Sequence, residues 1–168
     1  MLKTTTPDWK FLFSHPAHFL SLGLGTGLAK KAPGTFGTLV AFPLYILIDD
    51  FDFYTELGII AALFLLGVWL CDFTGKALGV SDHGSIVWDE VVAMMLVLTF
   101  LPHFYINYTV AFLLFRLFDI WKPFPIRQCD AHIKGGFGVM IDDILAAAYT
   151  IISVKALTWI TPQIQPLI

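Results

Sequence analysis

Apolar runs separated by short polar connections divide the 168-residue chain. Four such regions stand out, at 36–48, 57–71, 91–118 and 144–160. The polar tract His103–Tyr108 interrupts the third region, which is therefore best interpreted as two antiparallel helices. The pattern predicts an all-α fold, a compact membrane bundle with about four or five hydrophobic helices.

The composition indicates the solvent around this bundle. Hydrophobic residues make up 57% of the chain and charged residues 14%, with a mean hydropathy of +0.76. A water-soluble domain carries roughly 25% charged residues. Each apolar run is shorter than the ~20 residues of a full membrane span. Two interpretations follow, buried helices of a soluble bundle or membrane helices with polar ends, and the low charge favours the membrane.

The distribution of basic residues predicts an orientation. If the helices alternate across the membrane, the connections 1–32, 72–90 and 119–143 lie on one side and contain eight of the ten Lys and Arg residues. The opposite set includes DDFDFYTE at 49–56 and contains none. Because cytoplasmic connections are enriched in Lys and Arg, the first set is expected in the cytoplasm. A re-entrant segment at Pro43 would change the number of spans.

The net charge and the two cysteines limit the classes of partner and the cellular compartment that are expected. The net charge is −3 and the basic residues form no stripe, so no nucleic-acid partner is expected. Cys71 and Cys129 lack metal-type spacing and are interpreted as reduced thiols on the cytoplasmic side. The N-terminal region has no continuous apolar core or cleavage site, so no removed signal peptide is expected. The sequence does not indicate an oligomeric state.

Two pairs of acids stand at the heads of apolar runs on the predicted cytoplasmic face. Asp89 and Glu90 precede the third run, and Asp142 and Asp143 precede the last. Acids at a helix N-terminus complement the helix dipole, which is one explanation. The alternative is metal binding, since neighbouring helices would bring two to four carboxylates together. Such an oxygen-only ligand set suits Mg²⁺.

Charged residues lie at the end of the fourth predicted helix and in the segment that follows it. Arg116, Asp119 and Lys122 are spaced i, i+3, i+6, which places them on one helix face that Pro123 then ends. A surface ion-pair ladder is the simplest interpretation. Arg116 lies deep enough in the apolar run that pairing with Asp119 is nearly required. Three cations are then free to bind an anion such as phosphate: Lys122, Arg127 and Lys134.

Two glycine-rich segments and one histidine complete the candidate site. KGGFG at 134–138 and APGTFGT at 32–38 could bring backbone N–H groups to phosphate oxygens, with Thr35 and Thr38 as further ligands. Glycines also serve turns or close helix packing. His83 in SDHGS is a candidate for proton transfer or phosphate binding, with loop capping as the alternative.

Three sequence blocks resemble the signature blocks of the bacterial phosphatidylglycerophosphatase A family. They are GLGTGLAKKAPGTFGTLVAFPLY, DHGSIVWDEVVAMML and FRLFDIWKPFPIRQCDAHIKGGFGVMIDDILA, and the resemblance runs from about residue 19 to 148. It implies a multi-pass, all-helical lipid phosphatase of the bacterial inner membrane, with a cytoplasmic active site. The implied reaction is Mg²⁺-dependent removal of the terminal phosphate of phosphatidylglycerophosphate. The expected domains are an N-terminal segment 1–18, a membrane domain 19–161 and a tail 162–168.

The residues and the resemblance agree on a hypothetical mechanism. The metal ligands are Asp89, Glu90, Asp142 and Asp143. The catalytic candidates are Asp89, Asp119, Asp143 and His83. The phosphate ligands are Lys122, Arg127, Lys134, Arg116, Thr35 and Thr38. Asp119 either orients Arg116 or acts as a general base, and the orienting role is favoured.

A membrane transporter is the main alternative function, because transporters also use intramembrane charges and broken helices. Transporters usually place polar groups near the bilayer midplane, however, whereas these charges gather on one side. The distribution therefore favours the phosphatase.

Overall fold

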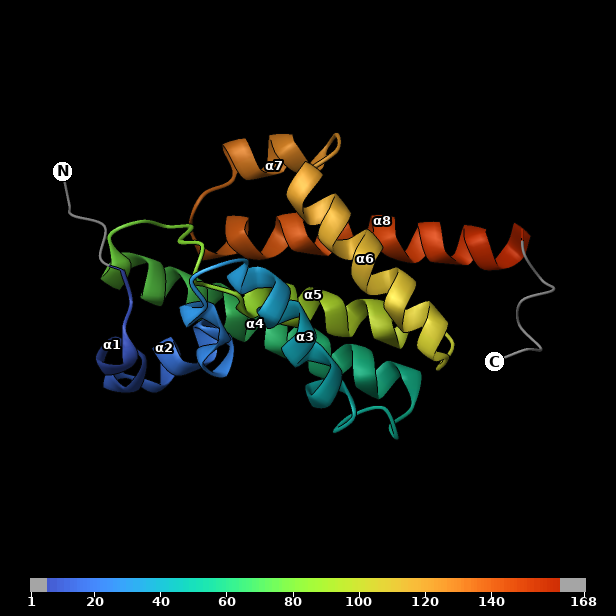
Figure 1. Cartoon of the computed structure of the whole chain (residues 1–168), viewed down its shortest axis with the longest axis horizontal. Helices are drawn as coiled ribbons and strands as arrows, with labels where there is room; N and C mark the ends of the chain where they lie inside the picture. The colour runs from blue at the N-terminus through green and yellow to red at the C-terminus, as the bar shows by residue number, and fades with distance from the viewer. Residues whose placement is uncertain (1–5, 161–168) are drawn as a thin grey trace.

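The computed structural model describes residues 6–160, and this part of the chain is helical with no strand (Figure 1). The predicted all-α fold is confirmed. The elements are α1 Trp9–Ser14, α2 Pro16–Ser21, the 3₁₀ helix η1 Gly23–Leu28, α3 Pro33–Tyr45, α4 Phe53–Leu78, α5 Trp88–Thr99, α6 Tyr105–Trp121, α7 Ile126–His132 and α8 Gly135–Ile160.

Helix α5 forms the centre of the bundle. It packs against α3, α4 and α8, and α6 reaches it while packing mainly on α8 (Figure 1). An uninterrupted run from Val91 to Met95 is almost completely buried. A helix that is apolar on all sides is stable only when neighbours surround it, so this central position follows from the sequence VVAMM.

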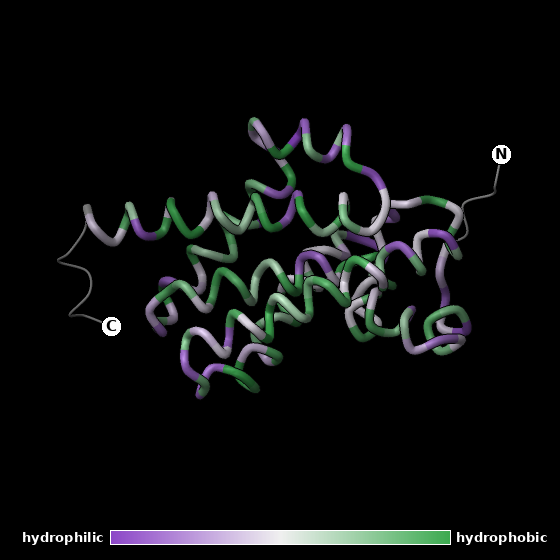
Figure 2. Tube along the Cα trace, turned by 180° about the vertical axis from the view of Figure 1, so that it is seen from behind, coloured by the Kyte–Doolittle hydropathy of each residue, from purple (hydrophilic) through white to green (hydrophobic). Residues whose placement is uncertain are grey.

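Two helices, α4 and α8, are long and apolar enough to cross a membrane among the residues that the structure describes. Each has 26 residues, a length of ~39 Å against ~30 Å for a bilayer core. Figure 2 shows the hydrophobic residues along these helices. Both helices are longer than the apolar runs seen in the sequence, because each helix extends into the polar residues that flank its run. In α4 the side chain of Asp52 caps the start, and Gly79 ends the helix with φ +82°.

Helix α8 begins at Gly135, well before the apolar run that starts at Ile144. The KGGFG segment is therefore mostly helical, and its glycines permit close packing. A Cβ on Gly136 would lie 1.8 Å from the carbonyl oxygen of Val68 in α4. Asp142 consequently lies about two turns inside the helix, where it is too far from the N-terminus to act as a cap.

The N-terminal helices pack onto the bundle at the end where α4 finishes. Leu12 and Ala17 are buried, and the hydroxyl of Ser21 donates to the carbonyl oxygen of Leu70 at 2.9 Å. The expected boundary at residue 18 falls inside α2. The expected tail, 162–168, lies outside the described residues.

The contact between α4 and α8 generates a test with a matched control. Gly136→Ala should lower the free energy of unfolding by about 1–3 kcal/mol, because the added methyl must push the helices apart. Gly58→Ala, also in a long helix, has nothing within 4 Å of its new Cβ. It should stabilise by about 0.5–1 kcal/mol. Thermal unfolding in detergent measures both, and equal melting temperatures would show that the helix contact tolerates separation.

Candidate active site

A polar pocket of about 270 Å³ lies at the end of the bundle where α5 and α8 begin and α6 ends. It collects side chains that are far apart in the sequence, from α3, the connection before α5, α5 itself, α6 and α8. Its charged residues are Asp82, Asp89, Glu90, Arg116, Asp119, Lys122, Asp142 and Asp143. Ala32, Pro33, Gly34, Gly84, Ile86 and Val139 complete the lining.

The carboxylates of α5 and α8 meet in this pocket. Oxygen atoms of Asp89, Glu90 and Asp143 all lie within 4.8 Å of one another. Adjacent helix residues point about 100° apart, yet both acids of α5 reach the same cluster. The packing of α5 against α8 thus brings together the two acid pairs that the sequence places on separate helices.

Several of these oxygens are buried without a hydrogen-bond partner. They are Oδ1 of Asp89, Oε2 of Glu90, Oδ1 of Asp142 and Oδ2 of Asp143. A buried carboxylate oxygen without a partner is costly, by about 1–3 kcal/mol or more for a charged group. Oxygens in this state are available to a metal ion, and the oxygen-only set matches the preference of Mg²⁺. Asp89, Glu90 and Asp143 are the residues best placed to hold one.

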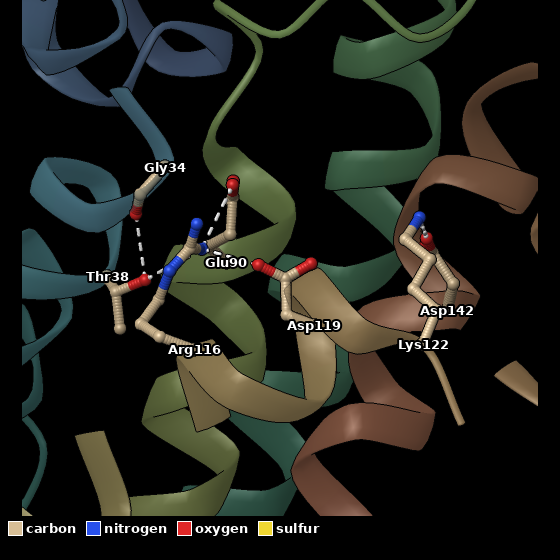
Figure 3. Close-up of polar contacts among 7 residues, drawn as sticks. All are labelled: Gly34, Thr38, Glu90, Arg116, Asp119, Lys122 and Asp142. Atoms are coloured by element: carbon tan, nitrogen blue, oxygen red, sulfur yellow. Dashed lines mark hydrogen bonds and ion pairs between the residues drawn. The ribbon is translucent and has the colours of Figure 1, made fainter. Parts of the chain in front are cut away.

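Arg116 joins three helices beside the cluster (Figure 3). Its Nη1 lies 2.6 Å from Oδ2 of Asp119 and 3.4 Å from Oε1 of Glu90. The same nitrogen donates to Oγ1 of Thr38 in α3, at 3.4 Å. Its Nε is buried without a partner and remains available to an anion. The expected pair with Asp119 is present, as the favoured orienting role of Asp119 requires.

Gly34 makes room for this group. A Cβ at Gly34 would lie 2.1 Å from Oε1 of Glu90 and 3.0 Å from the Arg116 guanidinium. The Thr38 hydroxyl, one turn along α3, donates to the carbonyl oxygen of Gly34 at 2.8 Å. The glycine of APGTFGT therefore serves close packing against the charged groups.

Lys122 does not lie on the helix face that its i, i+3, i+6 spacing with Arg116 and Asp119 predicts. Helix α6 ends at Trp121, and Lys122 takes a left-handed conformation with φ +48°. Its Nζ reaches Oδ2 of Asp142 in α8 at 2.5 Å and Oδ1 of Asp130 at 3.3 Å. Partial burial alone would lower the pKa of Lys122, but the hydrogen bond to Asp142 and the two carboxylate charges outweigh it. The pKa is raised, so Lys122 is a permanent cation in this position.

Five of the predicted site residues do not line the pocket, although one of them, Thr38, accepts a hydrogen bond from Arg116 beside it. Thr35 lies on α3 and His83 in the connection before α5, where its Nδ1 accepts from the backbone N–H of Ser85 at 3.1 Å. Arg127 is exposed on α7. Lys134 is exposed and donates to the carbonyl oxygen of Asp130 at 2.8 Å. In this structure His83 makes the kind of contact that the capping alternative describes.

Three residues of this region were not singled out from the sequence. Asp82 precedes His83 and lines the pocket, and Gly34 packs against Glu90. Asp130 pairs with Lys122. A signal existed for Asp82 and Gly34, because both lie inside the motif-like blocks. Asp130 lies inside the third block as well, but its pairing with Lys122 depends on how α7 sits against the end of α6.

Comparison with known proteins identifies the family. The family model of Phosphatidylglycerophosphatase A matches residues 19–158. The chain is 46% identical over 155 residues to Phosphatidylglycerophosphatase A of Haemophilus influenzae, covering 91% of this chain and 95% of the relative. It is 43% identical over 134 residues to the Escherichia coli protein of the same name, covering 79% and 78%.

A further relative is the Putative phosphatidylinositol-3-phosphatase of Bacteroides thetaiotaomicron, 36% identical over 149 residues, with 84% of this chain and 92% of the relative covered. No solved structure matches the chain significantly. The matched residues include the whole carboxylate cluster and both pocket cations. The chain therefore belongs to the phosphatidylglycerophosphatase A family and is a phosphoric monoester hydrolase.

Proposed function

We propose that the protein hydrolyses phosphatidylglycerophosphate to phosphatidylglycerol and inorganic phosphate, and that the reaction depends on Mg²⁺. One observation carries the metal requirement. The pocket has six carboxyl groups and only two cationic side chains. A phosphate monoester is itself an anion, and this surplus of negative charge would repel it. A divalent cation reverses the local sign and lets the phosphate approach.

The donor set fits such an ion. Asp89, Glu90 and Asp143 would hold it, because their oxygens converge and each has one oxygen without a partner. Asp142 has a free Oδ1 as well, although its other oxygen is taken by Lys122. Bound Mg²⁺ supplies Lewis-acid polarisation of the phosphoryl group and lowers the pKa of a coordinated water.

The remaining polar residues act on the substrate. Arg116 and Lys122 neutralise the phosphoryl oxygens as negative charge develops on them. Asp119 holds the Arg116 guanidinium at 2.6 Å and keeps it aimed at the pocket. The unpartnered Oδ1 of Asp142 accepts a hydrogen bond from the attacking water and fixes its direction.

The position of the pocket supports a lipid substrate on the cytoplasmic side. The pocket lies where α4 ends and α8 begins, which is headgroup depth if these two helices cross the membrane. Lys30, Lys31 and Lys76 belong to segments near the same end of the bundle. This distribution supports a cytoplasmic orientation in the inner membrane. The grouping of the charges at one end also argues against a transporter, which would need them near the midplane.

The metal proposal is tested by phosphate release from phosphatidylglycerophosphate in detergent, with Mg²⁺ and with EDTA. Asp89→Asn should reduce turnover on the order of 100-fold or more, because the metal contributes several kcal/mol to transition-state stabilisation. The matched control, Asp50→Asn, changes an exposed acid outside the pocket and should leave turnover unchanged. Weaker Mn²⁺ binding by Asp89→Asn in electron paramagnetic resonance would locate the defect at the metal. Full activity in EDTA would refute the proposal.

Lys122 gives a separate prediction for phosphate handling. Lys122→Ala should lower kcat/KM about 10- to 100-fold, as expected for loss of a charged hydrogen bond worth about 1.5–3 kcal/mol. Lys76→Ala removes a lysine of an exposed pair with Asp72 and should change nothing. Steady-state kinetics measure both variants. Wild-type kinetics for Lys122→Ala would limit this residue to a structural pair with Asp142.

The orientation is tested with single cysteines in a Cys71→Ala, Cys129→Ser background. Asp50→Cys should react with a membrane-impermeant maleimide from the outer side of the inner membrane, since Asp50 lies in the acidic connection between α3 and α4. Lys76→Cys should react only after that membrane is opened. The reverse labelling pattern would invert the topology.

A further inference from the structure

A second cavity, of about 440 Å³, lies between the C-terminal part of α3 and the N-terminal part of α6. Its volume is in the range of ligand-binding pockets. The lining is mainly apolar and aromatic, with Leu98 of α5 contributing from the central helix. The other lining residues are Leu39, Phe42, Tyr45, Ile46, Asp49, Tyr105, Tyr108, Thr109 and Phe112.

The cavity and the polar pocket share the same face of α3. Gly34 lines the polar pocket, and Thr38, one turn further, binds Arg116. Phe42 and Tyr45 follow at the next turns and line the cavity. Residues spaced by three or four lie along one helix face, and Gly34 and Phe42 are separated by ~12 Å along the axis.

Helix α6 repeats this arrangement in the opposite direction. Arg116 and Asp119 face the polar pocket, while Phe112 and Thr109, at the preceding turns, line the cavity. The two helices approach each other through the Arg116–Thr38 hydrogen bond and through Phe42, whose ring lies 6.1 Å from Tyr108 and 6.4 Å from Phe112. A single seam between α3 and α6 therefore passes from charged to apolar.

The walls of the cavity are open to their surroundings. Leu39 on α3, Ile46 directly after that helix and Thr109 on α6 are exposed in the bundle. Exposed apolar side chains beside a cavity gain free energy when another apolar group covers them. In a membrane this group is a lipid chain. This chain can belong to any membrane lipid or to the substrate itself.

We propose that this cavity binds an acyl chain of the same phospholipid whose terminal phosphate occupies the polar pocket. The inference rests on the proposed function and adds a specificity site to it. In phosphatidylglycerophosphate a glycerol, a phosphodiester and a second glycerol separate the terminal phosphate from the chains. The chains must therefore lie at a distance from the reacting group, as the cavity does. The seam also leads away from the pocket, towards the end of the bundle where α3 ends and α6 begins.

The test compares two substrates, long-chain phosphatidylglycerophosphate and its deacylated, water-soluble glycerophosphoglycerol phosphate, in the same detergent. Thr109→Trp and Leu39→Trp fill the cavity from opposite walls. Each should raise KM for the long-chain substrate about tenfold, which corresponds to ~1.4 kcal/mol of binding. Neither should change kcat/KM for the deacylated substrate. Ile106→Trp is the matched control, an exposed residue of α6 at similar depth that does not line the cavity.

The outcomes separate this inference from the proposed function. Unchanged kinetics of both folded variants on the long-chain substrate would overturn the acyl-chain site. Equal losses on the two substrates would also overturn it, because the walls would then support the polar pocket and not the chain. If the wild-type protein released phosphate from neither substrate, the proposed function would fail and this inference with it. Two variants on different helices keep the test decisive if one does not fold.

Discussion

The approach of α5 to α8 is the contact on which the rest of the structure depends. It forces carboxylates of two helices into one buried pocket, with one oxygen on each of Asp89, Glu90, Asp142 and Asp143 left without a hydrogen-bond partner. Like charges at this distance repel each other and cost stability. The apolar burial of α5 on all sides holds them there. On the proposed function, Mg²⁺ relieves this repulsion, so the folded state and the bound metal stabilise each other.

Two cations organise the remaining charge, and they do so differently. Arg116 connects α3, α5 and α6 through Thr38, Glu90 and Asp119. Its planar group suits several oxygen partners at once. Lys122 leaves its helix in a left-handed turn and reaches across to α8. Both cations thus link neighbouring helices as well as facing the pocket, so shape and electrostatics of the site are set by the same contacts.

The seam between α3 and α6 relates the polar site to the membrane. Charged groups lie at one end of it and apolar rings at the other, on the same two helix faces. A soluble phosphate ester would need only the first part. The amphiphilic form of the seam is consistent with a substrate that has a phosphorylated headgroup and hydrocarbon chains, and with the place of the proposed site at the end of long apolar helices.

The sequence by itself determined the helical class, the four main acids, Arg116 with its partner Asp119, and the resemblance to the family. Local patterns suffice for these, because apolar runs form helices and a charge inside such a run requires a near partner. Tertiary structure decided which other groups join. It placed Asp82 and Gly34 at the pocket and left outside its lining Thr35, Thr38, His83, Arg127 and Lys134. It also started α8 at Gly135 and turned Lys122 towards Asp142. These outcomes depend on the register between helices that are distant in the chain. Close packing of glycines such as Gly136 against a neighbouring backbone sets this register. Hydrophobic periodicity does not encode it.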